Sequence, residues 1–95
     1  MRILGLDPGT GRLGYAVIDA GGGTVRCLTY GCAETPPQGS PGARLRDARD
    51  AIETILRQFR PEQAVLERLY FSKNVRTALT VAEARGMLLT LLADA

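Results

Sequence analysis

The sequence contains no histidine and no tryptophan, and Lys73 is its only lysine. Without histidine, acid–base catalysis by imidazole, Ser-His-Asp triads and histidine metal ligands are all excluded. Any catalysis must therefore use carboxylates. The formal net charge of +2 is too small to indicate a nucleic-acid-binding protein by itself.

Cysteines and long hydrophobic runs are also scarce. Cys27 and Cys32 lie five residues apart in one expected strand, and an odd offset places their side chains on opposite faces. We therefore expect two reduced thiols rather than a disulfide or a zinc site. The apolar run at 87–92 is far shorter than the roughly 20 residues of a membrane span, and no secretory signal opens the chain. These absences predict a cytoplasmic protein without a membrane association.

The 95 residues, 45% of them hydrophobic, are enough for one small folded domain over residues 1–95. The first third is rich in glycine and contains three short segments with strand-forming residues, at 3–7, 14–19 and 24–32. Short glycine turns separate them, which predicts an antiparallel three-strand meander. A proline-rich loop over 34–42 follows.

The hydrophobic period changes after this loop. Ser40 and Pro41 are typical of a helix start, and Pro61 ends that helix. Its apolar stripe comprises Leu45, Ala48, Ile52, Ile55, Leu56 and Phe59. A fourth strand is expected at 64–67, and a second helix from about residue 74 through Leu79, Ala82, Gly86 and Leu89.

This order of elements predicts an α/β fold with a mixed sheet. A strand–helix–strand connection favours parallel pairing, so the fourth strand is expected beside the first. The first strand ends in Asp7 and the fourth in Glu67, which brings two carboxylates to one sheet edge. Two carboxylates that close repel each other unless a cation lies between them, and Mg²⁺ suits such ligands. The spacing alone is also compatible with a turn-forming aspartate and a solvated glutamate.

Two motifs resemble those of RuvC-type Holliday-junction resolvases. The opening motif is LGLDPGT at 4–10 followed by GYAV at 14–17, and the second is ERLYFSKN at 67–74. The segment Ala-Arg-Gly at 84–86 also fits the family.

The resemblance implies an RNase H-like fold and a homodimeric endonuclease that nicks four-way junction DNA with Mg²⁺, or Mn²⁺ as an alternative. It assigns Asp7 and Glu67 as catalytic, metal-binding residues. Tyr70 occupies the position of an aromatic residue that stacks on unpaired bases, although simple packing would equally account for it, and Lys73 and Asn74 would face DNA phosphates. Branch-migration proteins are implied as partners.

The resemblance implies that the family continues past this point, through a further strand and a final helix with more catalytic aspartates, so the chain is expected to be either a fragment of a longer enzyme or a truncated relative. We therefore expect the 95-residue chain alone to cleave poorly or not at all, and efficient Mg²⁺-dependent nicking by it would contradict this expectation.

Two other classes of function remain open from the sequence. One is an ATP-binding fragment of the actin-like or sugar-kinase type, whose opening turn the segment 7–10 loosely fits. The other is a non-catalytic, DNA-binding module that dimerises through the second helix. Ala78, Ala82 and Gly86 could seat a partner helix there or pack that helix on its own sheet. The arginines between 41 and 60 are expected on the solvated face of the first helix.

Overall fold

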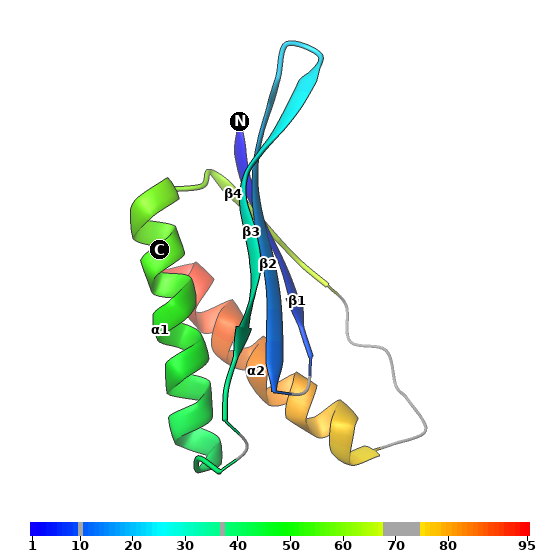
Figure 1. Cartoon of the computed structure of the whole chain (residues 1–95), viewed down its shortest axis with the longest axis vertical. Coiled ribbons are helices and arrows are strands. Elements are labelled where there is room, and N and C mark those ends of the chain that lie inside the picture. The colour runs from blue at the N-terminus through cyan, green and yellow to red at the C-terminus, as the bar shows by residue number, and fades with distance from the viewer. Residues whose placement is uncertain (10, 37, 68–74) are drawn as a thin grey trace.

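A four-stranded mixed sheet forms one layer of the molecule, and the helices form the other (Figure 1). The computed structural model describes residues 1–9, 11–36, 38–67 and 75–95. In chain order the elements are β1 (Arg2–Pro8), β2 (Arg12–Gly21), β3 (Thr24–Glu34), α1 (Pro41–Phe59), β4 (Gln63–Leu66) and α2 (Val75–Asp94). The strand order is β3-β2-β1-β4, with β1 antiparallel to β2 and parallel to β4. The predicted meander and the parallel fourth strand are both confirmed.

Glycine-containing turns connect the three antiparallel strands. The β1–β2 turn is closed by a hydrogen bond from the N–H of Gly9 to the carbonyl of Arg12, with N and O 2.7 Å apart. The β2–β3 turn contains Gly22 and Gly23, whose φ angles of 58° and 79° lie in the left-handed region that glycine adopts readily. The turn chemistry therefore explains why these strands pair with their neighbours in sequence.

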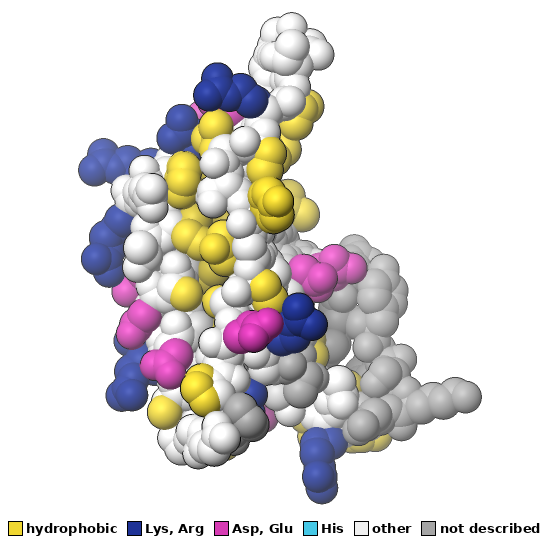
Figure 2. Space-filling model, in the orientation of Figure 1, with side chains coloured by type: hydrophobic (Ala, Val, Ile, Leu, Met, Phe, Trp, Pro, Cys, Tyr) yellow, Lys and Arg dark blue, Asp and Glu magenta, His cyan; other side chains and the backbone are white. Residues whose placement is uncertain are grey.

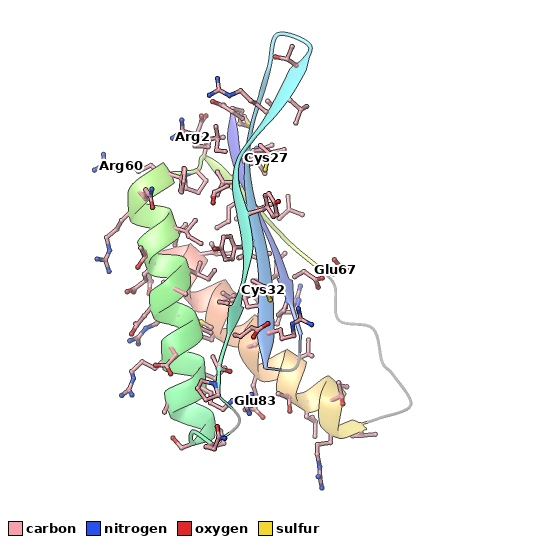
Figure 3. The ribbon with its side chains drawn as sticks, in the orientation of Figure 1. Arg2, Cys27, Cys32, Arg60, Glu67 and Glu83 are labelled. Carbon is pink, nitrogen blue, oxygen red and sulfur yellow. The ribbon has the colours of Figure 1, made fainter. Side chains whose placement is uncertain are left out.

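A β-bulge in β3 overturns the predicted placement of the cysteines. Val17 pairs with Thr29 but Ile18 pairs with Cys27, so Leu28 is an extra residue opposite β2. The extra residue reverses the alternation, and Cys27 and Cys32 lie on the same face (Figure 3). Their partners on β2 are four residues apart, about 13 Å at a strand's rise per residue, which is too far for a disulfide. Both thiols are free, as expected, and both are exposed.

Local signals fix both ends of α1. The Ser40 hydroxyl accepts a hydrogen bond from the N–H of Ala43 at 3.2 Å, and Pro41 occupies the first helical position. At the other end Arg60 has φ 46° and ψ 60°, and its N–H donates to the carbonyl of Leu56. Pro61 then prevents the helix from continuing. The boundaries predicted for this helix are therefore confirmed.

Both helices pack on one face of the sheet. The core cluster joins side chains of β1 and β2 to buried residues of both helices: Leu4, Leu6, Leu13, Val17, Ala48, Ile52, Ile55 and Leu88. Leu4, Val17, Ile52 and Leu88 have no exposed surface. Neither helix, within the part of the chain that the structure describes, is long and apolar enough to cross a membrane.

The opposite face of the sheet is not covered by either helix. It carries the exposed apolar side chains of Val25, Tyr30 and Val65. On the helix side, cationic side chains gather over the outer side of α1, at the left of Figure 2. Arg46, Arg49 and Arg57 of α1 are exposed, and so is Arg60 at its C-terminal cap, as the sequence predicts.

The apolar stripe expected for α2 does not coincide with its buried face. Leu79 and Leu89 are 60% and 48% exposed, and Gly86 is exposed as well. The buried residues of this helix are Ala78 and Leu88. Alanines and leucines occur all round α2, so the hydrophobic period could not identify which side faces the sheet.

Candidate active site

Asp7 and Glu67 lie at adjacent ends of the two parallel strands. The β1–β4 ladder runs up to the pair Leu6–Leu66, and each acid directly follows the last residue of that ladder on its own strand. The N–H of Glu67 donates to the carbonyl of Leu6 with N and O 3.0 Å apart, which extends the ladder by one bond. Figure 3 shows Glu67 at the end of β4. The two backbone positions that the sequence predicted to meet are therefore neighbours.

The register also determines which face of the sheet carries the two acids. Paired residues on neighbouring strands point to the same face, and successive residues alternate. Leu6 points into the core, so Asp7 one position later points away from both helices. Glu67 follows Leu66, which packs against the core, and it points the same way. Both carboxylates thus belong to the uncovered face, and both residues are exposed.

The electrostatic surroundings of the pair leave both carboxylates accessible. Among the described residues, neither acid takes part in an ion pair. Within that same part of the chain, no group of three or more histidine, cysteine, aspartate or glutamate side chains is placed to hold a metal ion. The described site therefore consists of two carboxylates from two strands.

The remaining predicted site residues cannot be compared with the structure. Tyr70, Lys73 and Asn74 all lie outside the described residues. Their assignments as DNA-contacting residues remain predictions from the family resemblance.

A pocket that the sequence did not reveal lies where the β1–β2 turn meets the two helices. Its volume is about 170 Å³, and its walls include Gly11, Arg12, Thr35, Arg44, Thr80 and Glu83. Arg44 is partly buried and donates from Nε to Thr35 Oγ1 at 3.2 Å. The prediction that it lies on the solvated face of α1 with the other arginines is therefore wrong. A hydrogen bond with Cys32, together with the electrostatic effects of Cys32 and of the Glu34 carboxylate, raises the pKa of Arg12.

Gly11 is expected to stabilise this arrangement. Its φ is 68°, and a Cβ at this position would lie 2.8 Å from Nη2 of Arg44. Gly11→Ala should lower the free energy of unfolding by about 1–2 kcal/mol, because an L-residue is strained in the left-handed region and Arg44 must move. Urea denaturation of the chain measures the change.

Gly42→Ala is the matched control for that prediction. Gly42 lies in the first turn of α1, and a Cβ there meets no atom within 4 Å. This substitution should leave stability unchanged or raise it by up to about 1 kcal/mol. Equal losses in the two variants would contradict the role assigned to Gly11.

The family model described as "Crossover junction endodeoxyribonuclease RuvC" matches residues 3–95, which is nearly the whole chain. The chain belongs to the RuvC family. The RuvC of Treponema pallidum is 45% identical over 92 residues, covering 97% of this chain and 47% of that protein. The chain thus spans about half the length of the curated relatives that it matches.

Solved RuvC structures share the fold. The structure of T. thermophilus RuvC in complex with Holliday junction substrate superposes with a TM-score of 0.90 at 27% identity, covering 99% of this chain and 60% of that one. A second Thermus thermophilus RuvC structure gives a TM-score of 0.87 at 28% identity, with 99% and 58% of the two chains covered. The RNase H-like fold expected from the resemblance is therefore confirmed. The ATP-binding and non-catalytic alternatives gain no support from these comparisons.

Proposed function

We propose that this chain supplies two catalytic carboxylates, Asp7 and Glu67, to an endonuclease that resolves Holliday junctions by metal-dependent phosphodiester hydrolysis. The observation that carries the proposal is the position of the two acids, on the same face and at the ends of paired parallel strands. Membership of the RuvC family and the likeness to a RuvC solved with junction DNA support it.

The donor set fits a hard divalent cation. Mg²⁺ is held in proteins by one or two carboxylates together with water and substrate phosphates, and Asp7 and Glu67 provide two exposed carboxylates without competing ion pairs among the described residues. These two residues would hold Mg²⁺, or Mn²⁺ in its place. When bound, the ion would lower the pKa of a coordinated water and neutralise charge at the scissile phosphate. The chain's own part is to keep the two carboxylates at a fixed separation on rigid strands.

The rest of the substrate contact is assigned from the family pattern. We assign Tyr70 to stacking on bases at the junction centre, and Lys73 and Asn74 to the phosphates, with residues 1–95 acting as one domain. Base–aromatic stacking is worth about 1–3 kcal/mol per base, which is sufficient to help open a junction. Because the proposed substrate is chromosomal DNA, the proposal includes a cytoplasmic location and branch-migration proteins as partners.

A homodimer through α2 is part of the same proposal. The side of α2 away from the core exposes Val75 to 67%, Leu79 to 60% and Leu89 to 48%, and Gly86 on that side has open space around it. Apolar residues around an exposed glycine allow a second helix to approach closely. Ala78, by contrast, is 7% exposed and packs within its own domain.

Leu79→Glu is expected to shift this chain from dimer to monomer, with at least a tenfold rise in the dimer dissociation constant, about 1.4 kcal/mol. The added charge would have to be desolvated in the interface. Sedimentation velocity over a concentration series measures the change. Val25→Glu, at the 72% exposed Val25 of the β2–β3 hairpin, is the control and should leave association unchanged. A parent chain that is monomeric at micromolar concentration would contradict the dimer.

The test of the proposed function uses a hybrid protein, in which these 95 residues are joined to the part of the T. pallidum RuvC outside the match. The hybrid should nick a synthetic four-way junction when Mg²⁺ is present and leave a linear duplex of the same sequence uncut. No nicking by a folded hybrid that binds the junction, under conditions where the intact T. pallidum protein cleaves, would overturn the proposal.

A further inference from the structure

The carbonyl of Glu67 receives its hydrogen bond from a side chain. Arg85, on α2, donates from Nε to this oxygen at 3.3 Å. The N–H of Glu67 donates to the carbonyl of Leu6 at 3.0 Å. Glu67 is thus held at its N–H by β1 and at its carbonyl by α2.

The sequence of β1 explains why a side chain is needed there. In a parallel ladder, a residue that donates to the carbonyl preceding its partner also accepts from the N–H following that partner. Glu67 donates to Leu6, so the next donor in the series would be the N–H of residue 8. Residue 8 is proline, which has no N–H. The Arg85 guanidinium therefore supplies the hydrogen bond that Pro8 cannot supply.

The two hydrogen bonds restrict the backbone conformation of Glu67. The soft torsions φ and ψ of Glu67 lie between its N–H and its carbonyl, and both groups are held. Fixing these torsions fixes the direction of the Cα–Cβ bond of Glu67, and therefore the face of the sheet on which its carboxylate lies. The anchor on β1 is the carbonyl of Leu6, one residue before Asp7.

We propose that Arg85 is a positioning residue for the carboxylate pair, replacing the donor missing at Pro8 and so keeping Glu67 beside Asp7. The importance of Arg85 for catalysis rests on the proposed function, whereas its hydrogen-bonding role can be tested separately. Arg85 acts through the backbone of Glu67 and needs no contact with the reacting atoms.

The first experiment measures backbone protection in the chain by amide hydrogen exchange. Arg85→Met keeps the aliphatic stem and removes the donor, and it should speed exchange of the Glu67 N–H about tenfold while amides of the β1–β2 ladder keep their rates. Arg57→Met is the matched control, since Arg57 is an exposed arginine of α1 bonded to Glu53, and it should leave Glu67 unchanged. Unchanged protection at Glu67 in Arg85→Met would overturn the proposal.

A second substitution separates this role from a general packing role. Pro8→Ala restores an N–H at the position from which the ladder would donate to Glu67. Combined with Arg85→Met, it should recover at least half of the lost protection. A double variant that is no better protected than Arg85→Met alone would show that Arg85 does not replace the ladder donor, and a thermal melt of each variant confirms folding.

The functional consequence is measured as Mn²⁺ affinity of the hybrid protein by electron paramagnetic resonance. Arg85→Met should weaken Mn²⁺ binding about 10–100-fold, the usual effect of removing a group that orients a metal ligand, and Arg85→Lys should be intermediate. Junction affinity should change less than about threefold. Faster exchange at Glu67 with unchanged Mn²⁺ affinity would overturn the positioning role. A parent hybrid that binds no Mn²⁺ would instead overturn the proposed function, and the exchange data would still decide the hydrogen-bonding role.

Discussion

Asp7→Asn in the hybrid protein is expected to slow junction cleavage about 10³-fold or more, while junction affinity changes less than about threefold. A metal ion contributes several kcal/mol of charge stabilisation to phosphoryl chemistry, and each 1.36 kcal/mol is a factor of ten in rate. Asparagine keeps the shape of aspartate but removes the charge that attracts the cation. Contacts with DNA phosphates do not depend on this charge, so the substitution should slow cleavage without weakening junction binding. Gel-shift and single-turnover cleavage assays measure the two quantities, and Glu67→Gln should behave alike.

Asp19→Asn is the control for this prediction. Asp19 is also a strand aspartate, but it faces the N-terminal amine at 3.7 Å and Arg2 at 3.9 Å, at the opposite end of the sheet. Its neutralisation should alter the cleavage rate less than about twofold, because surface ion pairs contribute little. Undiminished nicking by Asp7→Asn would refute the catalytic assignment of Asp7.

Ile52→Ala is expected to have the largest effect on stability. Ile52 lies on α1, has no exposed surface and belongs to the cluster that joins both helices to the sheet. Truncation should lower the free energy of unfolding by about 2–5 kcal/mol, through lost transfer energy and the cavity that remains. Chemical denaturation followed by circular dichroism measures this change.

Val25→Ala serves as the comparison, since Val25 is a β-branched aliphatic residue that is 72% exposed. It should cost no more than about 0.5 kcal/mol. A similar loss in both variants would contradict the view that the core lies between α1 and the sheet.

The sequence predicts the course of the chain well because its local signals agree with one another. Ser40, Pro41 and Pro61 delimit α1, and turns containing glycine delimit the strands. The relation of Asp7 to Glu67 was also predictable, because strand–helix–strand connections favour parallel neighbours. Short-range chemistry and one rule of topology thus suffice for the main outline of the candidate site.

Features that depend on tertiary contacts were not predictable in the same way. The bulge at Leu28 changes the face of the sheet on which Cys27 lies, and no residue type near Leu28 predicts a bulge. The partly buried position of Arg44 follows from Thr35 and Gly11, which are remote in sequence. Arg85 reaches Glu67 across 18 residues, and only the register of β1 and β4 reveals that Pro8 leaves a carbonyl without its ladder donor.

The extra residue in β3 has a practical consequence for spectroscopy. It puts both thiols on the same side of the sheet as the acids, and Cys32 pairs with Gly14, which in turn pairs with Asp7. Two strand spacings, about 10 Å, separate the backbones of Cys32 and Asp7. With Cys27 replaced by serine, a nitroxide attached to Cys32 would lie close enough to a paramagnetic ion held by Asp7 for its signal to be broadened, so the chain carries a native attachment point for observing that ion directly.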